Sequence, residues 1–222
     1  MIIKAIKDIN SDLLQEVLEI LYESFPEEER EEDEKIKERL MMSVNSRLQN
    51  GKSFHVLAGS EGGVVVAFSI YLYNANYGLG FLAYFATDQK VRGRGYGTKM
   101  FKGLLKHLQT IAEQYENELK GLCWQLERPK DVSDEKEVNK RKRRIHFYEK
   151  NGGILLPWIN FKEPLKEDGV SCYYLMYHPS SSNQENRITP LLQKNIIDYL
   201  YLDCYEVNEQ DKDYISALKS VK

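Results

Sequence analysis

The sequence has few cysteines, no long apolar run and almost no net charge, and each of these features excludes a class of protein. Its three cysteines lie far apart with no CxxC pair, which argues against a disulfide framework and against a zinc site. No apolar run reaches the roughly 20 residues that a membrane-spanning helix needs, and the N-terminal residues do not form a secretory signal. The 31 basic residues nearly balance the 34 acidic ones, so nucleic-acid binding is not expected. We therefore expect a cytoplasmic protein that binds neither membranes nor nucleic acid.

The chain has enough apolar residues for a full core, and its patterns alternate between strand and helix. At 222 residues, of which 42% are hydrophobic, it suits one domain with a short appendage. Apolar spacing predicts strands at 2–6, 54–58, 64–73, 79–87, 122–126, 154–158 and 172–177, and helices near 13–22, 33–49, 101–112 and 133–150. Strand–helix–strand alternation between hairpin-like flanks predicts a mixed sheet with at least one parallel crossover.

A helical tail follows the last predicted strand. Residues 179–187 are a polar linker, and the tail itself covers residues 188–222. Thr189 and Pro190 are typical of a helix start, and apolar side chains then recur at helical spacing. Because such a tail cannot bury its apolar stripe alone, it must pack on the domain, on a second copy or on a partner. A homodimer through these C-terminal helices is one of these expectations.

The clearest functional pattern lies where the strand at 79–87 gives way to a long helix. Between them stand Arg92, Gly93, Arg94, Gly95, Tyr96, Gly97 and Thr98. The start of a helix exposes unpaired N–H groups, and glycines let an anion approach that backbone. The two arginines add positive charge, so the segment predicts a phosphate site. Its glycine spacing fits neither a P-loop nor a dinucleotide-binding fingerprint.

Two segments resemble the signatures of the GNAT superfamily of N-acetyltransferases. Residues 92–97, RGRGYG, resemble the first signature, and residues 147–152, FYEKNG, resemble the second. The order of predicted elements over residues 1–178 is similar as well, whereas the tail lies outside the resemblance. The sequence departs from the family pattern at three positions: Gln89 stands where proline is common, Arg141 where asparagine is frequent, and Gly153 where an aromatic residue is usual.

The resemblance implies an α/β (α+β) domain over residues 1–178. Its mixed, mostly antiparallel sheet of six to seven strands would splay at the centre between flanking helices, with residues 188–222 as a helical extension. The resemblance also implies acetyl-CoA as co-substrate and no metal. The pyrophosphate would lie on the amides of residues 92–98, and the pantetheine arm would lie beside Phe85, Ala86 and Thr87. The implied activity is direct acetyl transfer to a primary amine of a small molecule or peptide. The alternative is a non-catalytic acyl-CoA sensor or interaction module.

The reaction needs an oxyanion donor, a proton for the leaving thiolate and a proton acceptor for the amine. A backbone N–H near Phe85 or Ala86 is the natural oxyanion donor. Tyr148 stands at the family's proton-donor position, and an ordinary phenol with a pKa of about 10 keeps its proton at neutral pH. Strand alternation places Glu127 at the C-terminal end of its strand, where it could accept a proton directly or through water. Asp88 and bulk solvent are the alternatives, and Glu127 could instead pair with Arg128.

Two charged segments have less specific interpretations. The basic residues at 136–144 could form a solvated helix face or contact the 3'-phosphate of the cofactor. The acidic run Glu27–Glu34 could be a solvated loop, or it could attract a cationic amine at the acceptor site that the resemblance implies.

Overall fold

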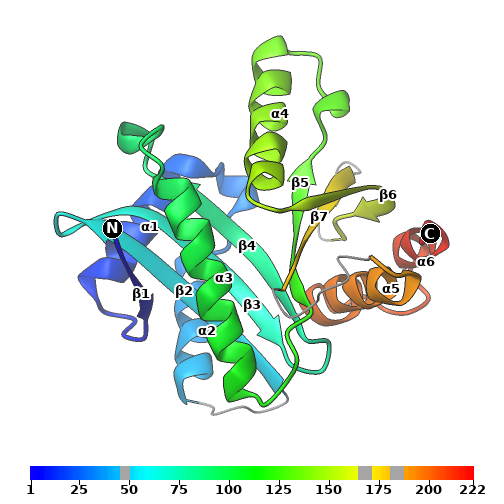
Figure 1. Cartoon of the computed structure of the whole chain (residues 1–222), viewed down its shortest axis with the longest axis horizontal. Helices are drawn as coiled ribbons and strands as arrows, with labels where there is room; N and C mark the ends of the chain where they lie inside the picture. The colour runs from blue at the N-terminus through cyan, green and yellow to red at the C-terminus, as the bar shows by residue number, and fades with distance from the viewer. Residues whose placement is uncertain (46–50, 165–171, 181–187) are drawn as a thin grey trace. The chain divides into compact units, whose positions relative to one another are not determined.

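The structure is a computed structural model that describes residues 1–45, 51–164, 172–180 and 188–222 (Figure 1). The chain divides into two compact units, Met1–Leu119 and Lys120–Lys222. Within the described residues, no helix is both long and apolar enough to span a membrane.

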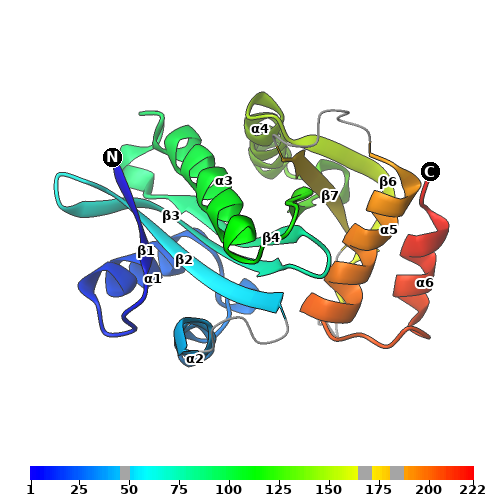
Figure 2. The same ribbon diagram turned by 60° about the horizontal axis from the view of Figure 1, so that its bottom comes forward.

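The first unit is an antiparallel sheet of four strands with helices on both faces (Figure 2). Its elements are β1 (Ile2–Ile6), α1 (Asp12–Ser24), the short turn η1 (Glu27–Glu29), α2 (Asp33–Asn45), β2 (Lys52–Glu61), β3 (Val64–Asn74), β4 (Leu79–Thr87), η3 (Gln89–Val91) and α3 (Tyr96–Gln114). The four strands lie in chain order, and each pairs with the next strand along the chain. The amphipathic α1 and α2 bury their apolar faces on one side of the sheet, and α3 covers the other side.

Local sequence signals explain most boundaries in this unit. Ser11 caps α1 by accepting the Leu14 N–H at 3.3 Å, as the cap pattern predicted. The predicted limits of β1 and β4 are confirmed. β2 is longer than the predicted 54–58, because β3 pairs with it from Lys52 to Glu61 and so continues the strand through non-apolar positions. The second predicted helix reaches Asn45, and its expected end near Asn50 lies outside the described residues.

The second unit is a smaller antiparallel sheet whose strand order is β5-β7-β6. Its elements are β5 (Gly121–Glu127), η4 (Pro129–Asp131), α4 (Glu135–Lys150), β6 (Ile154–Lys162), β7 (Cys172–Pro179), α5 (Pro190–Asp198), the π-helical turn η5 (Tyr199–Cys204) and α6 (Lys212–Lys219). α4 packs on the face that carries Trp124 and Met176. The opposite face carries Gln125 and Phe161, which contact η5 and the residue after it.

The C-terminal extension packs on its own unit along β6. Trp158 donates from Nε1 to Gln193 Oε1 at 2.9 Å, and the Asn160 N–H donates to Ser220 Oγ at 3.0 Å. The Tyr201 hydroxyl bonds both the N–H and the carbonyl of Lys162, at 3.0 and 2.8 Å. The extension therefore covers backbone groups of the edge strand that would otherwise be open to pairing. Of the three expectations for the tail, packing on the domain is the one observed here. Only Pro179 and Ser180 of the expected linker lie within the described residues.

The expected fold class is confirmed. Among the described residues, four strands in the first unit and three in the second give seven, antiparallel within each unit and flanked by helices. The expected parallel crossover and central splay stay predictions.

Candidate functional site

The glycine turn between β4 and α3 leaves the start of a long helix open. Gly93 and Gly95 have φ values of 82° and 79°, in the left-handed region that favours glycine. Gly95 is the N-cap of α3, and no side chain among the described residues caps the helix. A Cβ built at Gly93 or Gly95 would meet no atom within 4 Å. Open space therefore lies beside backbone N–H groups that have no intrahelical acceptor.

The side chains of this turn add positive charge around that space. Arg92 and Arg94 are exposed, and Arg92 is oriented by a bond from Nε to the Thr87 carbonyl at 3.3 Å. Gly97 and Thr98 lie in the first turn of α3, where the positive end of the helix dipole acts. Open backbone donors, a helix start and two arginines together suit a pyrophosphate group. Asp88, the alternative proton acceptor, accepts the Lys90 N–H at 2.8 Å and so caps η3. Its carboxylate therefore has a structural role.

The strand that leads into the turn carries the other predicted binding residues. Phe85, Ala86 and Thr87 end β4 and pair with β3. Just before them Ala83 is an extra residue, because Tyr84 faces Ile70 while Leu82 faces Tyr71. The bulge increases the local twist of β4 at the point where the predicted pantetheine contact begins. All predicted binding residues thus form one continuous segment of the first unit.

The acidic run lies against β4 through Tyr84, a residue that sequence reasoning did not select. The Tyr84 hydroxyl accepts the Glu31 N–H at 2.9 Å and donates to the Glu29 carbonyl at 3.1 Å. Phe25 packs edge-on against the same ring at 5.3 Å. The Glu31 carboxylate pairs with Arg39 at 3.0 Å, and burial raises its pKa against the effect of that arginine. In the sequence, only the acidic run pointed to this region, and it does not show that Glu31 differs from the neighbouring carboxylates.

In the second unit, Tyr148 is a buried phenol on α4. Its ring lies 4.7 Å from that of Trp124 on β5, and only 5% of the residue is exposed. Burial raises the pKa of Tyr148, while the charge of Arg144 acts in the opposite direction. The group is therefore a protonated phenol at neutral pH. Gly153 follows the helix, and a Cβ there would lie 3.0 Å from the Tyr148 carbonyl and 3.1 and 3.2 Å from Met176 and Trp124, so a larger side chain would be crowded.

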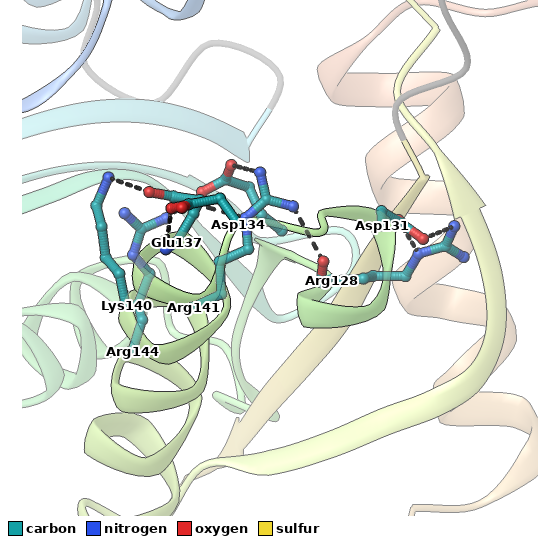
Figure 3. Close-up of polar contacts among 8 residues, drawn as sticks. Arg128, Asp131, Asp134, Glu137, Lys140, Arg141 and Arg144 are labelled. Carbon is teal, nitrogen blue, oxygen red and sulfur yellow. Dashed lines mark hydrogen bonds and ion pairs between the residues drawn. The ribbon is translucent and has the colours of Figure 1, made fainter.

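Glu127 ends β5 and binds two arginines of α4, Arg141 and Arg144, which are labelled in Figure 3. One carboxylate oxygen of Glu127 lies 2.7 Å from Arg141 Nη2, and the other lies 2.7 Å from Arg144 Nη1. Arg128, the partner that its position in the sequence suggested, pairs with Asp131 at 2.6 Å. Two members of the basic segment at 136–144 are therefore ion-paired to a strand end rather than fully solvated. No group of three or more possible metal-ligating side chains occurs within the described ranges.

Comparison with known proteins gives one family match and several structures of similar fold. Residues 14–120 match the family model described as the acetyltransferase (GNAT) family. Residues 14–120 therefore form a GNAT acetyltransferase domain. The match includes the glycine turn and the acidic run, whereas Tyr148 and Glu127 lie beyond it. A comparison with curated proteins found no match.

Solved structures of acetyltransferases share the fold. A protein from Bacteroides thetaiotaomicron described as a GNAT-family acetyltransferase aligns with a TM-score of 0.63 and 24% identity, over 94% of this chain and 100% of that chain. An aminoglycoside 6'-N-acetyltransferase complexed with coenzyme A aligns with a TM-score of 0.56 and 16% identity, over 81% of this chain and 97% of that chain. The ribosomal-protein-S18-alanine N-acetyltransferase from Escherichia coli aligns with a TM-score of 0.51 and 16% identity, over 84% of this chain and 99% of that chain.

Proposed function

We propose that this GNAT protein is an acetyl-CoA-dependent N-acetyltransferase that acts on a primary amine. The carrying observation is the glycine turn, where open backbone donors at the start of α3 lie beside Arg92 and Arg94. These groups suit the pyrophosphate of coenzyme A. The aminoglycoside acetyltransferase of similar fold was solved as a complex with coenzyme A, which supports the same cofactor class. The cytoplasmic location expected from cysteine usage is part of this proposal.

The chain's own residues then have defined tasks. Acetyl-CoA supplies the activated acetyl group as a thioester. A backbone N–H near Phe85 or Ala86 would donate to the developing oxyanion. Tyr148 Oη holds a proton at neutral pH and would deliver it to the leaving sulfur. For the amine proton, the sequence left Glu127, Asp88 and water as acceptors. Because Glu127 binds two arginines and Asp88 caps η3, we assign this proton to water.

The acidic run gives the acceptor its proposed chemistry. Carboxylates at Glu27–Glu34 lie on the loop that Tyr84 ties to β4, directly before the predicted oxyanion donors. A run of negative charge raises the local concentration of cationic amines. The acceptor is therefore a cationic primary amine of a small molecule or of a peptide.

A non-catalytic acyl-CoA sensor is the second candidate. It would use the same glycine turn but would not need Tyr148 to reach a reacting atom. The deep burial of Tyr148 favours this alternative.

A thiol-release assay with acetyl-CoA and a panel of amines separates the two. The panel contains spermidine, an aminoglycoside and short peptides with different N-terminal residues. Tyr148→Phe should lower turnover by roughly 10-fold to 10,000-fold, the span of general acid catalysis, while acetyl-CoA affinity stays the same. The matched control is Tyr115→Phe, which removes an exposed hydroxyl at the end of α3. Binding without thiol release for every amine would establish the sensor, and absence of both would overturn the proposal.

A further inference from the structure

The ion pairs between β5 and α4 connect the strand end to the helix that carries Tyr148. We call Glu127, Arg141 and Arg144 the ion-pair cluster. Its three side chains are 21%, 15% and 36% exposed, so the charges are partly shielded from solvent. Arg141 also donates from Nη1 to the Arg128 carbonyl at 3.0 Å (Figure 3). Two guanidiniums from the helix thus bind the last residues of the strand.

The spacing along α4 places this cluster on the same helix face as Tyr148. Arg144 precedes Tyr148 by four residues and Arg141 precedes it by seven, and these separations bring side chains onto one face. Trp124 contacts Tyr148 three residues before Glu127 on the same strand. β5 therefore meets this face of α4 at two points, one ionic and one aromatic. Two fixed points determine where the phenol lies relative to the strand.

From this geometry we infer that Glu127 is a positioning residue, which holds α4 and its Tyr148 ring through Arg141 and Arg144. The inference rests on the proposed function, in which Tyr148 is the proton donor. It differs from the role as proton acceptor that the sequence suggested. A general base needs an oxygen that can accept a proton from the amine. One oxygen of Glu127 accepts a charge-assisted hydrogen bond from Arg144 Nη1 at 2.7 Å, and the other lies 2.7 Å from Arg141 Nη2. A proton on Glu127 would weaken both ion pairs between partly shielded charges.

The test compares Glu127→Gln in two backgrounds, the wild type and the variant Arg141→Gln/Arg144→Gln. Measured quantities are kcat, the KM for the amine, the acetyl-CoA dissociation constant, the pH–rate profile and the melting temperature. Lys142→Gln is the matched control, because it removes a positive charge from the same helix at an exposed side chain. The control should leave every quantity unchanged.

A positioning role predicts that the effects of the substitutions on kcat are not additive. Once the arginines are replaced, the interaction is already lost, and removing Glu127 should have little further effect. Glu127→Gln should lower kcat by about 100-fold in the wild type, the order expected for a misplacement of about 1 Å. In the double-arginine background it should lower kcat by less than about 3-fold. The acetyl-CoA dissociation constant and the shape of the pH–rate profile should not change.

Three results would overturn the inference. Glu127→Gln could lower kcat by 100-fold or more in both backgrounds and abolish the acidic limb of the pH–rate profile, which would make it the base. It could leave kcat unchanged in the wild type. Its effect on the melting temperature could be the same in both backgrounds, which would show that no coupling exists. This last readout needs no turnover, so it stays informative if the proposed function itself fails because wild-type protein acetylates no amine.

Discussion

Replacing Tyr201 with phenylalanine removes one hydroxyl from the place where the C-terminal extension meets β6. Tyr201 is fully buried, and burial raises its pKa to about 12, so the group is a neutral phenol. Its hydroxyl accepts the Lys162 N–H at 3.0 Å and donates to the Lys162 carbonyl at 2.8 Å. The variant keeps the ring and its contact with Phe161 but leaves both backbone groups of Lys162 without this partner.

The cost of this change follows from the two lost bonds. A buried polar group that loses its partner costs about 1–3 kcal/mol. Lys162 is half-buried on an edge strand, so water can replace part of the loss, and we expect about 2 kcal/mol in total. In a chain of this length, 1 kcal/mol lowers the melting temperature by about 2–4 °C. Tyr201→Phe should therefore melt about 4–8 °C below the wild type.

Thermal unfolding of Tyr201→Phe beside Tyr115→Phe measures this effect. The Tyr115 hydroxyl donates to the Lys52 carbonyl at 3.2 Å in an exposed position, so its loss should cost less than about 0.5 kcal/mol. If Tyr201→Phe unfolds at the same temperature as Tyr115→Phe, the extension does not stabilise β6 as described.

Two further predictions concern pH. Burial and the nearby His107 lower the pKa of His55 to about 3 from an ordinary 6.5. The folded protein therefore favours the neutral ring, and stability is lost as the pH falls from about 6.5 toward 3. Between pH 7 and pH 5 this amounts to about 2 kcal/mol. Urea unfolding of His55→Gln should show a smaller loss over that interval, and parallel curves for variant and wild type would contradict the assignment. Burial raises the pKa of Glu31, so its ionised form costs stability once the pH lies above that raised pKa. Glu31→Gln should accordingly raise the melting temperature at pH 7 and raise it less at pH 4, whereas an equal gain at both values would exclude this cause.

Sequence patterns predicted the elements around the candidate site that depend on neighbours along the chain. β4, the glycine turn and the start of α3 are contiguous, and their glycine spacing and amphipathic period are local signals. The cap at Ser11 and the start of α5 after Thr189 follow from the same kind of short-range rule. These elements could be predicted because few distant contacts decide them.

Other features depend on contacts between distant residues. Glu127 could be placed at a strand end, but its partners Arg141 and Arg144 come from a helix that begins eight residues later. The nearest arginine in sequence, Arg128, binds Asp131 instead, because η4 turns that side chain toward its own segment. Likewise, an apolar stripe showed that the extension must pack somewhere, and only the contacts with β6 show where.

The most direct measurement of the central claim is a calorimetric titration of the protein with acetyl-CoA. The wild type should bind, and at about 100 times the dissociation constant the ligand should stabilise the fold by about 2.7 kcal/mol. For this chain length the corresponding melting shift is about 5–10 °C. Arg92→Gln/Arg94→Gln should weaken binding by at least about 10-fold, the value of about 1.4 kcal/mol for two lost charge contacts. Lys106→Gln, an exposed position further along α3, should bind as the wild type does. Absence of binding by the wild type, or equal affinity of the double-arginine variant, would contradict the assignment of the glycine turn as the cofactor site.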